Sequence, residues 1–246
     1  MITGAKEQVG PQARMTVHTG AVEASEEVAS ELSENSKNVK AYVRAKMQSA
    51  LDTALATAQP EAGEPAGWVD IYSVGPFQSG AVALPPGGTP LLPHAVIRVG
   101  ELAQITGVLV LNPNPLPPSN IVPCDMLSSL QLPYEIEFIT LNMTNGTPAP
   151  ALSTTISGNL VPGQCIYEEV FEFVPEERGC IFETNVCFRI LDCQYSSPSY
   201  SPFAGFATWV KNLDDPSFLD AFLGIPSPPV QPGFLFNTPV RYMTYR

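Results

Sequence analysis

Hydrophobic and polar residues alternate along much of this chain, most clearly between Leu160 and Asp192. From residue 182 to 190 the even positions are mostly apolar and the odd ones polar: Phe182, Thr184, Val186, Phe188 and Ile190 against Glu183, Asn185, Cys187 and Arg189. A period of two is typical of a strand with one face on a core. A second strand precedes it, and the sharp turn EERG joins them. This stretch therefore predicts two β-strands.

The same pattern, bounded by Gly, Pro, Asn and Asp turns, predicts short strands throughout the chain after residue 67. They are expected at Val69–Val74, Ala81–Leu84, Ala95–Val99, Ile105–Leu111, Tyr134–Asn142, Ser153–Leu160, Ile166–Val174, Phe182–Leu191 and Phe206–Lys211. Every other later segment is expected to be a turn or a proline-rich loop. No helix-length insert separates two strands, which favours an antiparallel sandwich over a parallel sheet. The expected domain is a mainly β, immunoglobulin-like antiparallel β-sandwich over residues 68–212.

One long amphipathic helix is expected before the sandwich, over residues 25–58. Ser25 is a suitable N-cap, and Pro60 ends the helical pattern. At 1.5 Å per residue the helix is roughly 50 Å long and projects beyond one sandwich. Its narrow apolar stripe consists of Val28, Leu32, Val39, Val43, Met47, Leu51 and Leu55. Two alternatives stay open: the stripe packs on its own sandwich, or it binds another copy.

The remaining segments are predicted to be appendages. Residues 1–24 resemble an extended arm, residues 59–67 a linker, and residues 213–246 a C-terminal extension. The extension contains a short amphipathic turn near Pro216–Leu223 and ends in an aromatic strand with Phe234, Phe236, Tyr242 and Tyr245. So much apolar surface must be covered. It either adds an edge strand to its own sandwich or pairs with the open edge of a neighbour.

The stretch from Ser157, SGNLVPGQCIYEEVFEFVPEERGCIFETNVCFRILD, resembles bacterial immunoglobulin-like modules, in particular the cell-adhesion-related domain found in bacteria. VGELAQITGVLVLNP, from Val99, is similar to their early strands. The resemblance covers less than half of the chain and implies a binding or spacer module without catalytic residues. It also implies that the two strands lie in opposite sheets, with Cys187 and Arg189 facing outward. Those modules often place a tyrosine after the turn glycine, where this chain has Cys180, so a tyrosine corner is not expected.

Composition and charge narrow the function further. The 246-residue chain is 44% hydrophobic, enough for a sizeable core, and its net charge of -12 excludes nucleic acid and anionic membranes as natural partners. Only 15% of residues are charged, so the surface is weakly ionic. Neither an 18-residue apolar window nor a signal-peptide pattern is visible, and no membrane span is expected. An extracellular surface or a virion is still favoured over the cytoplasm.

Five cysteines lie within 70 residues of each other but lack CxxC spacing, so zinc is not expected. Candidates for a disulfide are Cys165, Cys180, Cys187 and Cys193. The last two lie too far apart on an extended chain to bond each other, so a bridge needs a neighbouring strand or another subunit. Buried, reduced thiols are the alternative.

Catalytic chemistry has little support. A histidine-based site would rest on His94 with Cys124 or a loop serine as nucleophile, yet no GxSxG motif accompanies it. Paired carboxylates occur at Glu168–Glu169, Glu176–Glu177 and Asp214–Asp215. Calcium binding by Asp214, Asp215 and Asp220 fits no dedicated loop, and helix capping is favoured. No cofactor is expected.

The leading hypothesis is a non-enzymatic structural subunit that assembles with copies of itself, as a filament, surface layer or virion component, through its N-terminal helix and C-terminal strand. The alternative is a module that binds a carbohydrate or another protein. Its candidate contacts are Tyr195, Tyr200, Phe203 and Trp209. A hydrolase on the same scaffold is a third reading.

Overall fold

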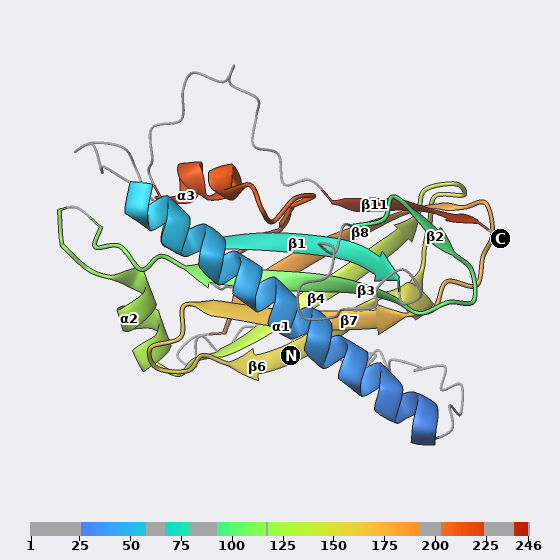
Figure 1. The fold of residues 1–246 in the computed structure, drawn as a ribbon, viewed down its shortest axis with the longest axis horizontal. Helices are drawn as coiled ribbons and strands as arrows, with labels where there is room; N and C mark the ends of the chain where they lie inside the picture. The colour runs from blue at the N-terminus through green and yellow to red at the C-terminus, as the bar shows by residue number, and fades with distance from the viewer. Residues whose placement is uncertain are drawn as a thin grey trace, which may run out of the picture.

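The chain folds into two packed β-sheets with a long helix across one of them (Figure 1). This computed structural model describes residues 26–57, 67–78, 93–116, 118–191, 203–223 and 239–245. The expected mainly β sandwich with an N-terminal helix is confirmed.

The smaller sheet has four strands in the order β10-β1-β3-β7. Their bounds are β1 (Val69–Gln78), β3 (Ala103–Leu111), β7 (Ile166–Phe173) and β10 (Thr208–Trp209). β3 pairs antiparallel with both β1 and β7, whereas the short β10 runs parallel to β1. The purely antiparallel sandwich that we expected is therefore corrected to a mixed one. Parallel pairing arises without a crossover helix because β10 reaches this sheet from the other one.

The larger sheet has seven strands, in the order β2-β11-β8-β4-β5, with β6 also paired to β4 and β9 to β8. Their bounds are β2 (Val96–Arg98), β4 (Pro133–Asn142), β5 (Thr147–Pro148), β6 (Thr154–Asn159), β8 (Ile181–Ile190), β9 (Ala204–Phe206) and β11 (Val240–Tyr245). β11 is antiparallel to β8 and parallel to β2. β7 and β8 lie in opposite sheets, as the family resemblance implied.

The strand expected at Phe206–Lys211 is in fact two strands in different sheets. β9 pairs with β8 as far as Phe206, and β10 pairs with β1 from Thr208. Between them the buried Ala207 carries the chain from one sheet to the other. Local alternation cannot distinguish one strand from two that change neighbours. The strand expected at Ala81–Leu84 lies outside the described residues.

Helix α1 (Glu26–Thr57) matches the predicted helix to within one residue at each end. In the described part of the chain, four shorter helices follow: α2 (Pro123–Ser129), η1 (Pro150–Leu152), η2 (Pro216–Leu219) and α3 (Asp220–Leu223). α2 corrects the expectation that the chain after the linker contains only strands, turns and loops. Pro123 and Asp125 favour its first turn, and Cys124 and Leu127 bury one face. Two turns are too short to show a helical period in the sequence.

Two hydrophobic clusters lie on either side of the four-stranded sheet. The inter-sheet core is rich in stacked and tilted aromatic rings from both sheets: Tyr134, Phe138, Tyr167, Phe171, Phe173, Phe182, Phe188 and Tyr242. The second cluster joins α1, η2 and α3 to the other face of that sheet. The four-stranded sheet is thus covered on both faces by the chain itself.

Candidate functional site

The apolar stripe of α1 is covered by the chain's own sandwich. Val39, Val43, Met47 and Leu51 are buried against β1, β3 and β7, and Leu55 packs beside them partly buried. These residues therefore pack on their own sandwich and do not bind another copy. This corrects their assignment to contacts between copies. The side chains of Val28 and Leu32 lie outside the described residues.

Ion pairs hold α1 to the edge strand β7. Arg44 Nε lies 2.6 Å from Glu168 Oε1, and Lys40 Nζ lies 3.2 Å from Glu169 Oε2. The Glu168 side chain is only 1% exposed, and among the described residues its Oε2 has no hydrogen-bond partner. Burial raises the pKa of Glu168, although the Arg44 guanidinium opposes the shift. The acidic pair that sequence reasoning singled out therefore anchors a helix.

The acidic residues near α3 also have structural partners. Asp214 Oδ1 lies 2.5 Å from Lys46 Nζ on α1, and Asp215 accepts a hydrogen bond from Ser217 N at the start of η2. The capping role expected for this acidic stretch is confirmed at Asp215. Among the described residues, no group of His, Cys, Asp and Glu is arranged to hold a metal ion.

The C-terminal strand β11 is an internal strand of the seven-stranded sheet, paired in cis with β8 and β2. Tyr242 is buried between the sheets, whereas Tyr245 remains 39% exposed. Tyr242 is therefore not available to another copy. Phe234 and Phe236 lie outside the described residues.

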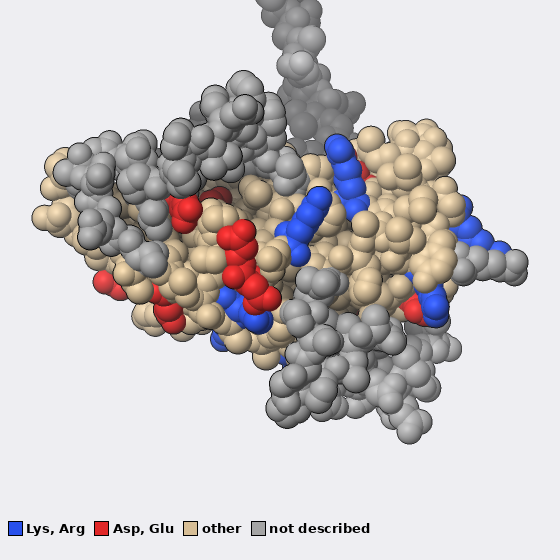
Figure 2. All heavy atoms as spheres, turned by 45° about the horizontal axis from the view of Figure 1, so that its top comes forward, with Lys and Arg blue, Asp and Glu red and all other residues tan. Residues whose placement is uncertain are grey.

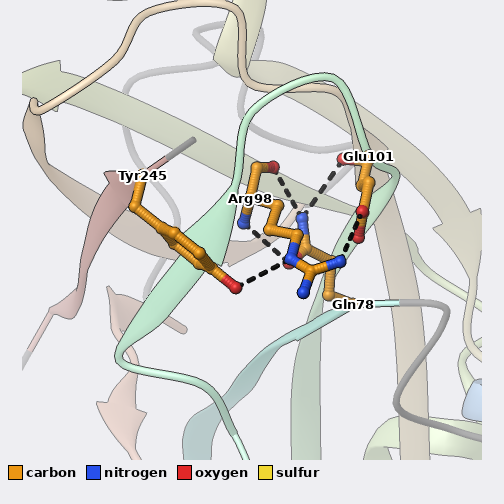
Figure 3. A network of polar contacts seen from close by, with 4 residues as sticks. All are labelled: Gln78, Arg98, Glu101 and Tyr245. Atoms are coloured by element: carbon orange, nitrogen blue, oxygen red, sulfur yellow. Dashed lines mark hydrogen bonds and ion pairs between the residues drawn. The ribbon is translucent and has the colours of Figure 1, made fainter.

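A polar network closes this end of the sandwich (Figure 3). Arg98 Nε donates a 2.8 Å hydrogen bond to the Tyr245 hydroxyl, and Arg98 Nη1 lies 3.2 Å from Glu101 Oε1. The buried Gln78 amide donates to the Arg98 carbonyl and accepts from the Arg98 N–H. The network joins the ends of β1, β2 and β11, which places Tyr245 and Arg98 together at the rim of the outer sheet face.

The outer face of the seven-stranded sheet carries a row of exposed apolar side chains. Met243 on β11 pairs with Val96 on β2 and with Ile181 on β8, and Met143 N donates to Ile181 O from the end of β4. These four residues are 42–50% exposed. Cross-strand partners share a face and have Cβ atoms about 5 Å apart, so the row is continuous. We call Val96, Met243, Ile181 and Met143 the apolar row.

Sequence reasoning missed the apolar row because its members come from three separate strands and from the residue after a fourth. Only Met243 and Ile181 lie next to residues that drew notice. In β8 and β11, Ile181 and Met243 are apolar residues at positions that the alternation assigns to the outer face. They are the weak signal in the sequence for this surface. Which residues lie side by side on it depends on strand order and register.

Charges elsewhere on the outer face are paired within it. Arg241 lies 2.8 Å from Glu183, and Arg189 contacts both Glu135 and Glu137. Arg189 thus faces outward as expected, on the same face as Cys187. On the face that Figure 2 shows, charged side chains form small separate groups within a mostly uncharged surface. The weakly ionic surface expected from composition is consistent with this view.

A groove of about 390 Å³ opens between the two sheets where β9 and β10 diverge. It is lined by Trp68, Val69, Asp70, Ile71, Phe203, Ala204, Gly205 and Phe206. The Phe203 ring stacks on Trp68 at a centroid distance of 5.9 Å. Of the predicted ligand contacts, only Phe203 lines this groove. Trp209 donates its indole N–H to the Gly75 carbonyl, and Tyr195 and Tyr200 lie outside the described residues.

The cysteines pair differently from the expectation. Cys165, before β7, forms a disulfide with Cys124 of α2, with Cα atoms 5.3 Å apart. Cys180 and Cys187 are free, and Cys193 lies outside the described residues. Burial, with a contribution from the Glu137 carboxylate, raises the pKa of Cys187 to about 11. Cys165 was among the candidates but its partner Cys124 was not, since 41 residues separate the two and only tertiary closure brings them together.

The disulfide also removes Cys124 as a nucleophile beside His94. A sulfur bonded to Cys165 provides no thiolate. The backbone N–H of His94 donates to the Pro76 carbonyl, so the residue anchors the chain entering β2.

A tyrosine clip occurs where none was expected. The Tyr167 hydroxyl accepts from Val161 N at 2.9 Å and donates to Gln164 O at 2.8 Å. It fastens the loop before β7, as the tyrosine corner of immunoglobulin folds fastens its own upstream loop. The expectation concerned a tyrosine after the turn glycine, near the start of β8, whereas Tyr167 lies in β7.

In the described part of the chain, no helix is both long and apolar enough to cross a membrane.

Comparison with known proteins identifies no family model and no curated protein that matches this chain. Among solved structures it is similar to the CARDB domain of the PF1109 protein from Pyrococcus furiosus, in complex with di-metal ions (11% identity, TM-score 0.29, 63% of this chain and 100% of that one). It is also similar to an immunoglobulin-like protein (PA1606) from Pseudomonas aeruginosa (10% identity, TM-score 0.26, 62% and 100%). A third similar structure is the apo form of the Calx CBD1 domain (11% identity, TM-score 0.23, covering 59% of this chain and 98% of that one). The sandwich assignment rests on the strand pairing described above.

Proposed function

We propose that this chain is a non-enzymatic immunoglobulin-like module that associates with copies of itself through the outer face of its seven-stranded sheet. It belongs to the class of structural subunits that build filaments, surface layers or virion parts. The apolar row carries the proposal. The route differs from the one the sequence favoured, because the apolar stripe from Val39 onward and Tyr242 pack within their own chain.

Hydrophobic burial supplies the attraction. Val96, Met243 and Ile181 lie in register on three adjacent strands and Met143 follows directly after β4, and each of the four is close to half exposed. Contiguous apolar patches are uncommon on monomeric proteins and mark interaction surfaces. The backbone of a strand is already ordered, so little backbone freedom is lost when a flat partner covers this face.

Electrostatics favour this face for contact between two copies. A chain with a net charge of -12 repels its own copies in general. On the outer face Arg241, Arg189 and Arg98 each pair with a glutamate of the same chain. Three arginines face four glutamates in these pairs, because Arg189 contacts two, so the local charge is close to balanced and a second copy meets little like-charge repulsion there.

The test is the molar mass in solution, measured by size-exclusion chromatography with light scattering over a concentration series. We expect the wild-type chain to form a dimer or larger species, and Ile181→Lys/Met243→Lys to shift to monomer. The matched control, Leu130→Lys/Val161→Lys, changes two apolar residues of similar exposure away from the row and keeps the wild-type mass. A wild-type chain that stays monomeric at its highest soluble concentration would overturn the proposal.

The inter-sheet groove favours a second candidate function, recognition of another molecule. Its volume lies within the range of ligand sites, and aromatic rings line it.

A further inference from the structure

We propose that the inter-sheet groove is an acceptor for an extended peptide strand, and that its occupant is the segment at residues 233–238 of a second copy. The inference rests on the proposed self-association for the identity of the partner. It uses a surface separate from the apolar row.

One wall of the groove is an open strand edge. Ile190 N donates to Phe203 O, and Ala207 N donates to Val186 O. The residues of β9 that bond to β8 are therefore the odd-numbered ones. In an antiparallel pair the alternate residues direct their N–H and C=O groups to the other side. Ala204 and Phe206 thus present backbone groups away from β8, and among the described residues no strand pairs with them there.

The opposite wall is a second open edge. Asn112 N donates to Trp68 O, so the even-numbered residues at this end of β1 bond to β3. Val69 then faces away from β3, and β10 pairs only with Tyr72 and Ser73 farther along. The Ile71 N–H also faces away, and its hydrogen bond goes to the Asp70 carboxylate. Apart from the Ile71 N–H, both edges therefore carry backbone groups at the groove that no strand pairs within the described part of the chain, and another strand would match them.

The floor of the groove specifies the side chains of the occupant. Ile71 lies beneath Gly205, where an added Cβ would come within 3.3 Å of Ile71 Cδ1. The stacked rings of Trp68 and Phe203 complete an apolar lining. A strand added to β9 directs alternate side chains between the sheets. Its inward positions must therefore be apolar, whereas a sugar would leave the backbone edges unmatched.

The chain itself contains a segment with this chemistry. Residues 233–238 read GFLFNT, with aromatic residues at the alternate positions 234 and 236 and no charge. Leu223, the last described residue before this segment, lies close to the groove, because Gly67 N next to Trp68 donates to Phe222 O. Strand addition by main-chain hydrogen bonds, with alternate side chains in pockets, is a recurring mode of recognition.

The experiment measures binding of a fluorescein-labelled peptide, Gly-Phe-Leu-Phe-Asn-Thr, to the full chain by fluorescence anisotropy. The chain is used as wild type and as Phe234→Ser/Phe236→Ser, which removes competition by its own segment. We expect saturable binding to both proteins. Gly205→Val, whose side chain fills the groove, should weaken binding by at least about tenfold. The same peptide with N-methyl groups at both Phe residues should lose binding similarly, because it cannot donate the strand hydrogen bonds.

The N-methylated peptide keeps the test valid if Gly205→Val fails to fold. Leu130→Ser, on an exposed residue of α2's C-terminal end, is the control variant and should bind as wild type. Equal affinity for the normal and N-methylated peptides would overturn strand addition. At a protein concentration where the wild-type chain is monomeric, binding only to Phe234→Ser/Phe236→Ser would overturn the second copy as occupant, since the segment would then fill its own groove. Peptide binding by a wild-type chain that stays monomeric at its highest soluble concentration would leave the groove as a strand acceptor, and would overturn both the second copy as its occupant and self-association through the apolar row.

Discussion

At the scale of single residues, Glu168 shows how a polar position in a strand serves the fold. In the sequence, Glu168 and Glu169 form one of the carboxylate pairs that we considered as candidate catalytic groups. In the structure its side chain lies beneath α1, paired on one oxygen with Arg44 and without a partner among the described residues on the other. Burial opposes its negative charge and raises its pKa.

Glu168→Gln should therefore change how stability depends on pH. Burial raises the folded-state pKa of Glu168 above 4.5, so protonation favours the fold. The contribution of this protonation to the free energy of unfolding is fully present below the pKa of Glu168 in the unfolded chain. It is lost as the pH rises through the folded-state pKa. We expect the free energy of unfolding of wild type minus that of Glu168→Gln to fall as the pH rises above 4.5. Urea unfolding at a series of pH values measures it.

The exposed Glu176→Gln is the matched control for this series. A difference that instead grows with rising pH would mean that attraction to Arg44 outweighs burial, contrary to the direction given above.

At the scale of elements, α1 was predicted almost to the residue, yet its partner was not. A cap residue, a proline beyond the end and a stripe spaced by fours define a helix locally. The same stripe fits a sheet of the same chain or a helix of another copy. The structure places Met47 and Val43 against β1 and β3, with Arg44 and Lys40 over β7.

Met47→Ala tests whether this docking holds in solution. Met47 is 1% exposed, and a truncation of this kind in a core costs about 2–5 kcal/mol. Alanine keeps the helix propensity, so the loss reports packing alone. We expect a lower midpoint of chemical unfolding with an unchanged slope.

Ser49→Ala, on the exposed side of α1, is the control and should change stability by less than about 0.5 kcal/mol. If both variants were equally stable, α1 would not pack on the sandwich in solution, and its stripe would again be available to a partner.

At the scale of the whole molecule, the Cys124–Cys165 disulfide connects α2 to the strand that α1 covers. It closes a loop across 41 residues that contains β4, β5 and β6. In the chain-entropy model such a closure stabilises the fold by about 4 kcal/mol. The pairing agrees with an oxidising environment, because such bonds are rare where thiols are kept reduced.

Reduction of the Cys124–Cys165 disulfide should accordingly lower the free energy of unfolding by up to about 4 kcal/mol. Chemical unfolding with and without a phosphine reductant measures the shift in midpoint, and Cys124→Ser should reproduce it without reductant. Cys180→Ser/Cys187→Ser, which changes the two free thiols, should leave the reductant effect intact. An unchanged midpoint under reduction would show that the bond does not form or does not constrain the unfolded chain.

What the sequence by itself determined is the set of local elements: the helix ending before Pro60, the strands around Phe188 and Phe171, and the capping Asp215. Periodicity, caps and turn residues act over a few positions, so each is visible in one short segment. The tertiary structure alone decided which elements meet. It split β9 from β10 at Ala207, placed β11 between β8 and β2, joined Cys124 to Cys165, and aligned the apolar row across neighbouring strands. Long-range pairing depends on the whole chain closing at once, because many partners are locally equivalent and only the shared core distinguishes them.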